Sequence, residues 1–130
     1  MKHLLPTEAW DLLQAQPQAL LIDVRMKVEF DCVGHPPNAI NIPWYEFPSE
    51  EPDPDAFVAA VQAAAGDKNR PIVLLCRSGS RTVKAARCLD AAGFTQVINV
   101  LDGFEGELDD DLHRCTETGW RFCGLPWVQS

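Results

Sequence analysis

The chain has 130 residues, 46% of them hydrophobic and 23% charged, with a formal net charge of −8. This length and composition predict one globular domain over residues 1–130. The acidic balance argues against nucleic acid or an anionic membrane as the main partner, and no apolar run approaches the roughly 18 residues of a membrane span.

Short apolar or β-branched runs bounded by turn residues predict strands along the chain. They are residues 20–24 (LLIDV), 38–42 (NAINI), 71–76 (PIVLLC) and 95–100 (TQVINV), with residues 3–5 as an additional edge strand. Residues 48–55, with three prolines and four acids, predict an exposed connecting loop.

Helical patterns occur between these runs, at residues 7–16, 55–66 and 80–93. Thr7 is the predicted N-cap of the first helix, and Asp55 is the predicted start of the second. Gly66 and Gly93 are the expected stops of the second and third helices. Apolar strands that alternate with helices predict an α/β fold with a largely parallel sheet covered on both faces.

Cys76 ends one of the predicted strands, at the edge of the sheet where α/β proteins bind ligands. Between positions 68 and 87 the sequence has six cations and no acid, although the protein as a whole is acidic. A charge run is usually a solvated helix face. Here the cations begin before the helix and flank a Gly/Ser loop, so we favour an anion site around Cys76.

The loop after Cys76 contains the features that favour a reactive thiolate. A helix N-terminus and nearby cations both stabilise a thiolate, and residues 77–81 supply both. The glycine allows the tight curvature that points successive N–H groups at an anion, and arginine donors suit oxyanions. The alternative is an inert core cysteine. We predict instead that Cys76 is a nucleophile that an incoming oxyanion can reach, with substrate bound by the loop residues Arg77, Ser78, Gly79, Ser80 and Arg81.

The sequence Cys-Arg-Ser-Gly-Ser-Arg at 76–81, which follows an apolar strand and opens a helix, resembles the active-site loop of the rhodanese (sulfurtransferase) family. Three further blocks resemble that family in the same order: residues 21–44 (LIDVRMKVEFDCVGHPPNAINIPW), 98–106 (INVLDGFEG) and 119–127 (GWRFCGLPW). The sequence departs from the usual family pattern at Asn38, where a glycine is common; asparagine tolerates positive φ better than most residues.

This resemblance implies a central, mostly parallel five-stranded sheet with helices on both faces, and a persulfide-forming cysteine that maps onto Cys76. The implied reaction moves sulfur from a small anionic donor such as thiosulfate to cyanide or a thiol, without a cofactor or metal. A non-catalytic docking module and a persulfide carrier for a protein acceptor are alternatives. A related phosphatase or arsenate reductase is a weaker one, because those loops have five residues between cysteine and arginine and this one has four.

Other polar residues have simpler structural interpretations. Asp23, Arg25 and Glu29 fit a structural ion-pair set at the end of the first long strand, and His35 fits a hydrogen-bonded turn. Histidine and cysteine positions give no convincing second pair of ligands, so zinc is not expected.

The five cysteines form no close pairs and predict free thiols. A relay role for Cys88, Cys115 or Cys123 is only a weak hypothesis, and Cys32 has no assigned role. The first residues lack a signal-peptide core, so we expect a cytoplasmic location.

Overall fold

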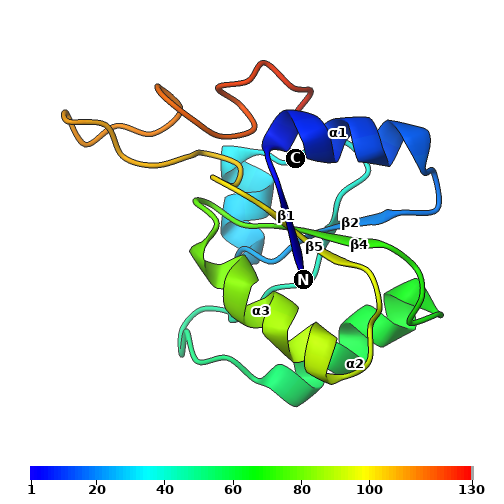
Figure 1. Ribbon diagram of the computed structural model, residues 1–130. Helices are drawn as coiled ribbons and strands as arrows, with labels where there is room; N and C mark the ends of the chain where they lie inside the picture. The colour runs from blue at the N-terminus through cyan, green and yellow to red at the C-terminus, as the bar shows by residue number, and fades with distance from the viewer. Residues whose placement is uncertain (130) are drawn as a thin grey trace.

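The computed structural model describes residues 1–129, and its centre is a five-stranded sheet (Figure 1). All pairings between neighbouring strands are parallel, in the order β1-β5-β4-β2-β3. The strands are β1 (Lys2–Leu4), β2 (Leu20–Asp23), β3 (Ile40–Asn41), β4 (Ile72–Leu75) and β5 (Val97–Val100). The prediction of a largely parallel α/β sheet is therefore confirmed.

Helices cover both faces of this sheet, as parallel strands joined by crossovers require. Helix α1 (Pro6–Ala15) lies on one face, and α2 (Pro54–Ala65) and α3 (Ser80–Ala91) lie together on the other (Figure 1). A single π-helical turn, η1 (Glu29–Val33), follows β2 and is absent from the sequence-based expectation. Within residues 1–129, no helix is long and apolar enough to cross a bilayer.

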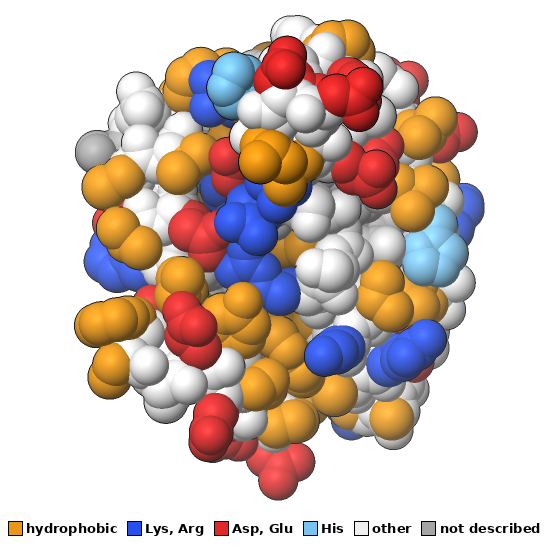
Figure 2. All heavy atoms as spheres, turned by 90° about the vertical axis from the view of Figure 1, so that its left-hand side faces the viewer, with side chains coloured by type: hydrophobic (Ala, Val, Ile, Leu, Met, Phe, Trp, Pro, Cys, Tyr) orange, Lys and Arg blue, Asp and Glu red, His pale blue; other side chains and the backbone are white. Residues whose placement is uncertain are grey.

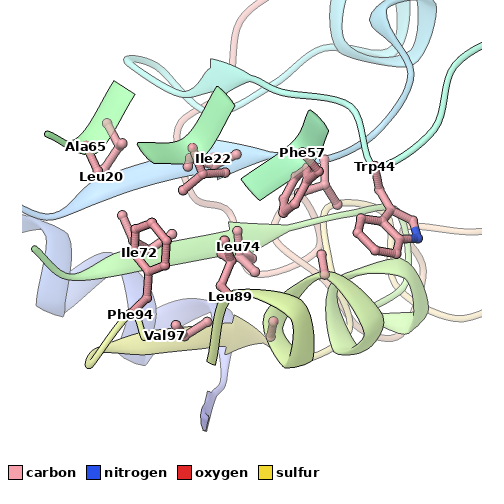
Figure 3. Close-up of a cluster of buried hydrophobic side chains, with 14 of the residues drawn as sticks. Leu20, Ile22, Trp44, Phe57, Ala65, Ile72, Leu74, Leu89, Phe94 and Val97 are labelled. Atoms are coloured by element: carbon pink, nitrogen blue, oxygen red, sulfur yellow. The ribbon is translucent and has the colours of Figure 1, made fainter. Parts of the chain in front are cut away.

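The residues of β4 alternate strictly between two hydrophobic cores, because successive side chains in a strand point to opposite faces. Ile72 and Leu74 pack with α2 and α3, next to Leu20, Ile22, Phe57 and Leu89 (Figure 3). Val73 and Leu75 pack on the other face with α1 and with the C-terminal residues Phe104 and Trp120. This alternation places Cys76, the next residue, on the α2/α3 face.

Two helix starts differ from the prediction. Helix α1 begins at Pro6 rather than after a Thr7 cap, and the Leu5 N–H donates to Glu8 Oε1 at 2.8 Å. Proline suits a first helical position because its φ is already helical and it has no N–H that needs a partner. Helix α2 is capped by Asp53, whose side chain accepts from the Ala56 N–H, and not by Asp55.

Candidate active site

Cys76 follows β4 directly, at the carboxyl edge of the sheet, where the chain turns into α3. Its Sγ accepts a hydrogen bond from the Gly79 N–H at 3.1 Å, and no other amide of residues 77–81, all of them described, donates to this sulfur. The side chain of Cys76 is fully buried. The expectation that an oxyanion can reach the sulfur directly is therefore wrong for this conformation.

The loop keeps its shape through two glycines in left-handed conformations. Gly79 has φ +100° and is the N-cap of α3. Gly103 lies in the turn after β5, and a Cβ there would clash with the Cys76 carbonyl oxygen. The same turn donates two backbone hydrogen bonds to the loop, from Phe104 N to Cys76 O at 2.7 Å and from Glu105 N to Arg77 O at 2.9 Å. The turn after β5 thus clamps the base of the cysteine loop.

Arg81 is held by Glu29 and does not point freely to solvent. Its two terminal nitrogens donate to the two Glu29 carboxylate oxygens at 2.7 and 3.0 Å, and the guanidinium lies 5.5 Å from the centre of the Tyr45 ring. Burial alone would raise the pKa of Glu29, but the hydrogen bonds and charge of Arg81 outweigh burial and lower it. Burial likewise opposes ionisation of Arg81, yet Glu29 raises the Arg81 pKa. Both groups are therefore charged at neutral pH.

The predicted ion-pair set at the end of β2 is only half right. Asp23 and Arg25 form a fully buried pair, with Arg25 Nη2 2.6 Å from Asp23 Oδ2 and also 2.6 Å from the Gly34 carbonyl oxygen. Glu29 takes no part in this pair because it reaches across to Arg81. His35 is a turn histidine, as predicted: its Nδ1 lies 2.9 Å from the Phe30 carbonyl oxygen.

The remaining loop residues lie at the surface, with Arg77 and Ser80 exposed and Ser78 half-buried. The strands end towards the left of Figure 1, and the face on that side carries a central group of Lys and Arg side chains among apolar and acidic ones (Figure 2). This face therefore offers positive charge close to the end of the sheet that carries Cys76, with acidic side chains around it.

The other four cysteines are free thiols, as predicted. Cys32 and Cys123 are exposed, and Cys88 lies within α3. Burial raises the pKa of the Cys115 thiol, so a smaller fraction of it is present as the reactive thiolate at neutral pH. Among residues 1–129, no group of three or more His, Cys, Asp or Glu side chains is arranged to hold a metal ion.

Sequence reasoning missed two polar residues beside the sulfur. Thr82 and Asn99 are buried, and the Thr82 hydroxyl lies 3.7 Å from Cys76 Sγ. Neither falls in a pattern that predicts a site, because they come from α3 and β5 and meet only in the folded sheet.

The fold and the loop together define a parallel α/β protein with a cysteine at the carboxyl edge of its sheet and an amide directed at that sulfur. Comparison with known proteins gives the family. The model of the rhodanese-like domain matches residues 5–108. The chain therefore belongs to the rhodanese-like domain family, as the motifs predicted.

Several proteins resemble the chain over nearly its whole length. The protein RC0915 of Rickettsia conorii is 32% identical over 130 residues, covering 98% of this chain and 97% of that protein. The crystal structure of Rv0390 from M. tuberculosis has a TM-score of 0.86 at 37% identity and covers 100% of this chain and 98% of that one. The polysulfide-sulfur transferase homodimer of Wolinella succinogenes has a TM-score of 0.65 at 26% identity, covering 100% of this chain and 80% of the other.

Proposed function

We propose that the protein is a sulfurtransferase that carries sulfane sulfur on Cys76, with thiosulfate as a donor in vitro. One observation carries the proposal: Cys76 Sγ lies at the start of α3 and accepts the Gly79 N–H at 3.1 Å. An amide at a helix N-terminus stabilises negative charge on sulfur. The family and the polysulfide-sulfur transferase among the similar structures support the same chemistry.

The reaction needs two displacements at sulfur. The Cys76 thiolate attacks the outer sulfur of thiosulfate; the new S–S bond forms as the old one breaks, and sulfite leaves with the electron pair. Cyanide or a thiolate then attacks the outer sulfur of the persulfide, and Cys76 leaves as a thiolate. This is a ping-pong scheme in which one residue is first the nucleophile and then the leaving group. No cofactor, oxidant or general base enters it.

The buried sulfur requires the site to open before a donor binds. We assign this step to Arg81, which donates two hydrogen bonds to Glu29 in the closed site. A donor oxyanion can replace the Glu29 carboxylate on the same guanidinium. The planar carboxylate and a tetrahedral anion such as thiosulfate can both accept a pair of guanidinium N–H groups. Arg77 is exposed and is our candidate for the first contact with the donor. The amides of Ser78, Gly79 and Ser80 would then line the bound anion.

A thiosulfate-to-cyanide assay on the wild type and on Cys76→Ser tests the proposal, with Cys123→Ser as control because Cys123 is exposed and outside the loop. We expect thiocyanate from the wild type and from Cys123→Ser, and none above background from Cys76→Ser. Inactivity of all three with cyanide and with thiols would favour the docking module. Faster transfer to a protein thiol than to small thiols would identify a persulfide carrier.

A further inference from the structure

A hydrogen-bonded chain of side chains leads from the surface of the sheet to Thr82, which lies beside the buried sulfur. His3 in β1 and Asn99 in β5 are register partners on neighbouring strands, so their side chains point to the same side of the sheet. On that side Asn99 meets Thr82 in α3, and the first turn of α3 holds Thr82 next to Cys76. Thr82 and Asn99 are 0% and 1% exposed, whereas His3 is exposed. This row of side chains is therefore open to solvent at His3 and buried at Thr82.

The direction of each hydrogen bond follows from the donors and acceptors available. Asn99 Nδ2 lies 3.1 Å from His3 Nδ1, which accepts its hydrogen when the ring proton is on Nε2. This contact turns Asn99 Oδ1 towards Thr82, and the Thr82 hydroxyl donates to it. The Gly79 carbonyl oxygen, 3.0 Å away, is a second oxygen acceptor for the same hydroxyl. A hydroxyl has one hydrogen, so the sulfur at 3.7 Å receives none.

We propose that Asn99, anchored by His3, is a positioning residue that directs the Thr82 hydroxyl hydrogen away from Cys76 Sγ. The resting sulfur is then left with the Gly79 amide as its hydrogen-bond donor among the described residues. A thiolate that is stabilised less is a stronger nucleophile towards sulfur, because nucleophilicity falls as stabilisation increases. This functional consequence rests on the proposed sulfur transfer, but the effect on the ionisation of Cys76 does not.

The test follows the ultraviolet absorbance of the Cys76 thiolate as a function of pH. Each variant is measured against the same variant with Cys76→Ser, so that the other four cysteines cancel. In Asn99→Ala the Thr82 hydroxyl keeps only the neutral Gly79 carbonyl oxygen as acceptor, and the charged thiolate then competes better for its hydrogen. We expect the pH midpoint to fall by about one to two units, the size of one added hydrogen bond to a charged group. In the Thr82→Val background, the same Asn99→Ala change is expected to leave the midpoint in place.

Two further variants separate positioning from packing. Thr82→Ser keeps the hydroxyl, so Asn99→Ala added to it should lower the midpoint again. His3→Ala should lower it by less than Asn99→Ala, because water can replace the exposed imidazole. If Asn99→Ala does not fold, Asn99→Leu fills the same space without an acceptor and gives the same prediction.

The proposal is overturned if the midpoint fails to fall when Asn99 is replaced, or if it falls equally with and without the Thr82 hydroxyl. A lowered midpoint in a protein that transfers no sulfur would instead contradict the proposed function and leave the chain of hydrogen bonds intact.

Discussion

Replacement of Glu29 by glutamine tests whether Arg81 exchanges its carboxylate partner for the sulfur donor. In the resting protein Glu29 occupies Arg81 with two hydrogen bonds of 2.7 and 3.0 Å, and the two side chains are only 14% and 12% exposed. A donor anion must compete with this buried partner. Glutamine keeps the shape of glutamate but has no charge and only one acceptor oxygen, so it keeps one of the two hydrogen bonds and competes less well.

The magnitude follows from the hydrogen bond that is lost. A hydrogen bond to a charged group contributes about 1.5–3 kcal/mol, so Arg81 in the resting variant loses one such bond, about 1.5–3 kcal/mol, that a donor no longer has to displace. Since 1.4 kcal/mol is a factor of ten, we expect the KM for thiosulfate to fall at least roughly 10-fold, and at most roughly 140-fold, in Glu29→Gln. The kcat is expected to stay within about twofold, because the change acts on ground-state binding.

Initial rates of thiocyanate formation over a range of thiosulfate concentrations measure both constants. Glu46→Gln is the matched control, since it removes the same charge from the loop next to Tyr45 while its carboxylate binds backbone amides of Lys27 and Phe47 instead of Arg81. An unchanged KM in Glu29→Gln, or a fall of the same size in Glu46→Gln, would refute the exchange. A raised KM would mean that Glu29 prepares Arg81 for the donor.

Three further changes test the architecture around the loop. Gly103→Ala should lower the free energy of unfolding in urea by about 1–3 kcal/mol more than Gly124→Ala does. Both glycines have positive φ (+62° and +76°), but of the two only Gly103 has backbone within 4 Å of the added Cβ. Equal losses in the two variants would contradict the clamp. Glu29 has a lowered pKa in the folded protein, so its contribution to stability is present above its ordinary pKa of 4.5 and is lost as the pH falls below that value through the folded pKa. The stability difference between wild type and Glu29→Gln should therefore shrink on acidification, and a difference that grows towards low pH would refute this sign. Asp23→Asn leaves the buried Arg25 charge without its partner and should cost about 3–5 kcal/mol of unfolding free energy, whereas a loss below about 1 kcal/mol would argue that water reaches the pair.

The local sequence pattern was sufficient for the elements that bury apolar side chains. The run around Leu74 is apolar on both faces and is bounded by turn residues, so it predicted a strand with Cys76 at its end. Gly66 was also predicted correctly as the end of α2, where it adopts the left-handed conformation that favours glycine.

Contacts between distant segments were beyond the sequence pattern. Glu29 and Arg81 are 52 positions apart, and the spacing of Glu29 from Arg25 favoured the wrong partner. The burial of Cys76 was missed because a motif shows which residues form a loop but not which side chains pack over the sulfur in the folded core. Asn99 and His3 belong to opposite ends of the chain and become neighbours only when β1 pairs with β5.

The intact mass of the protein after incubation with thiosulfate tests the central claim most directly. The account predicts one added sulfur atom, located on the peptide that contains Cys76, removed by cyanide and absent from Cys76→Ser. No added sulfur, or sulfur located on one of the other cysteines, would contradict the assignment of Cys76 as the residue that carries it.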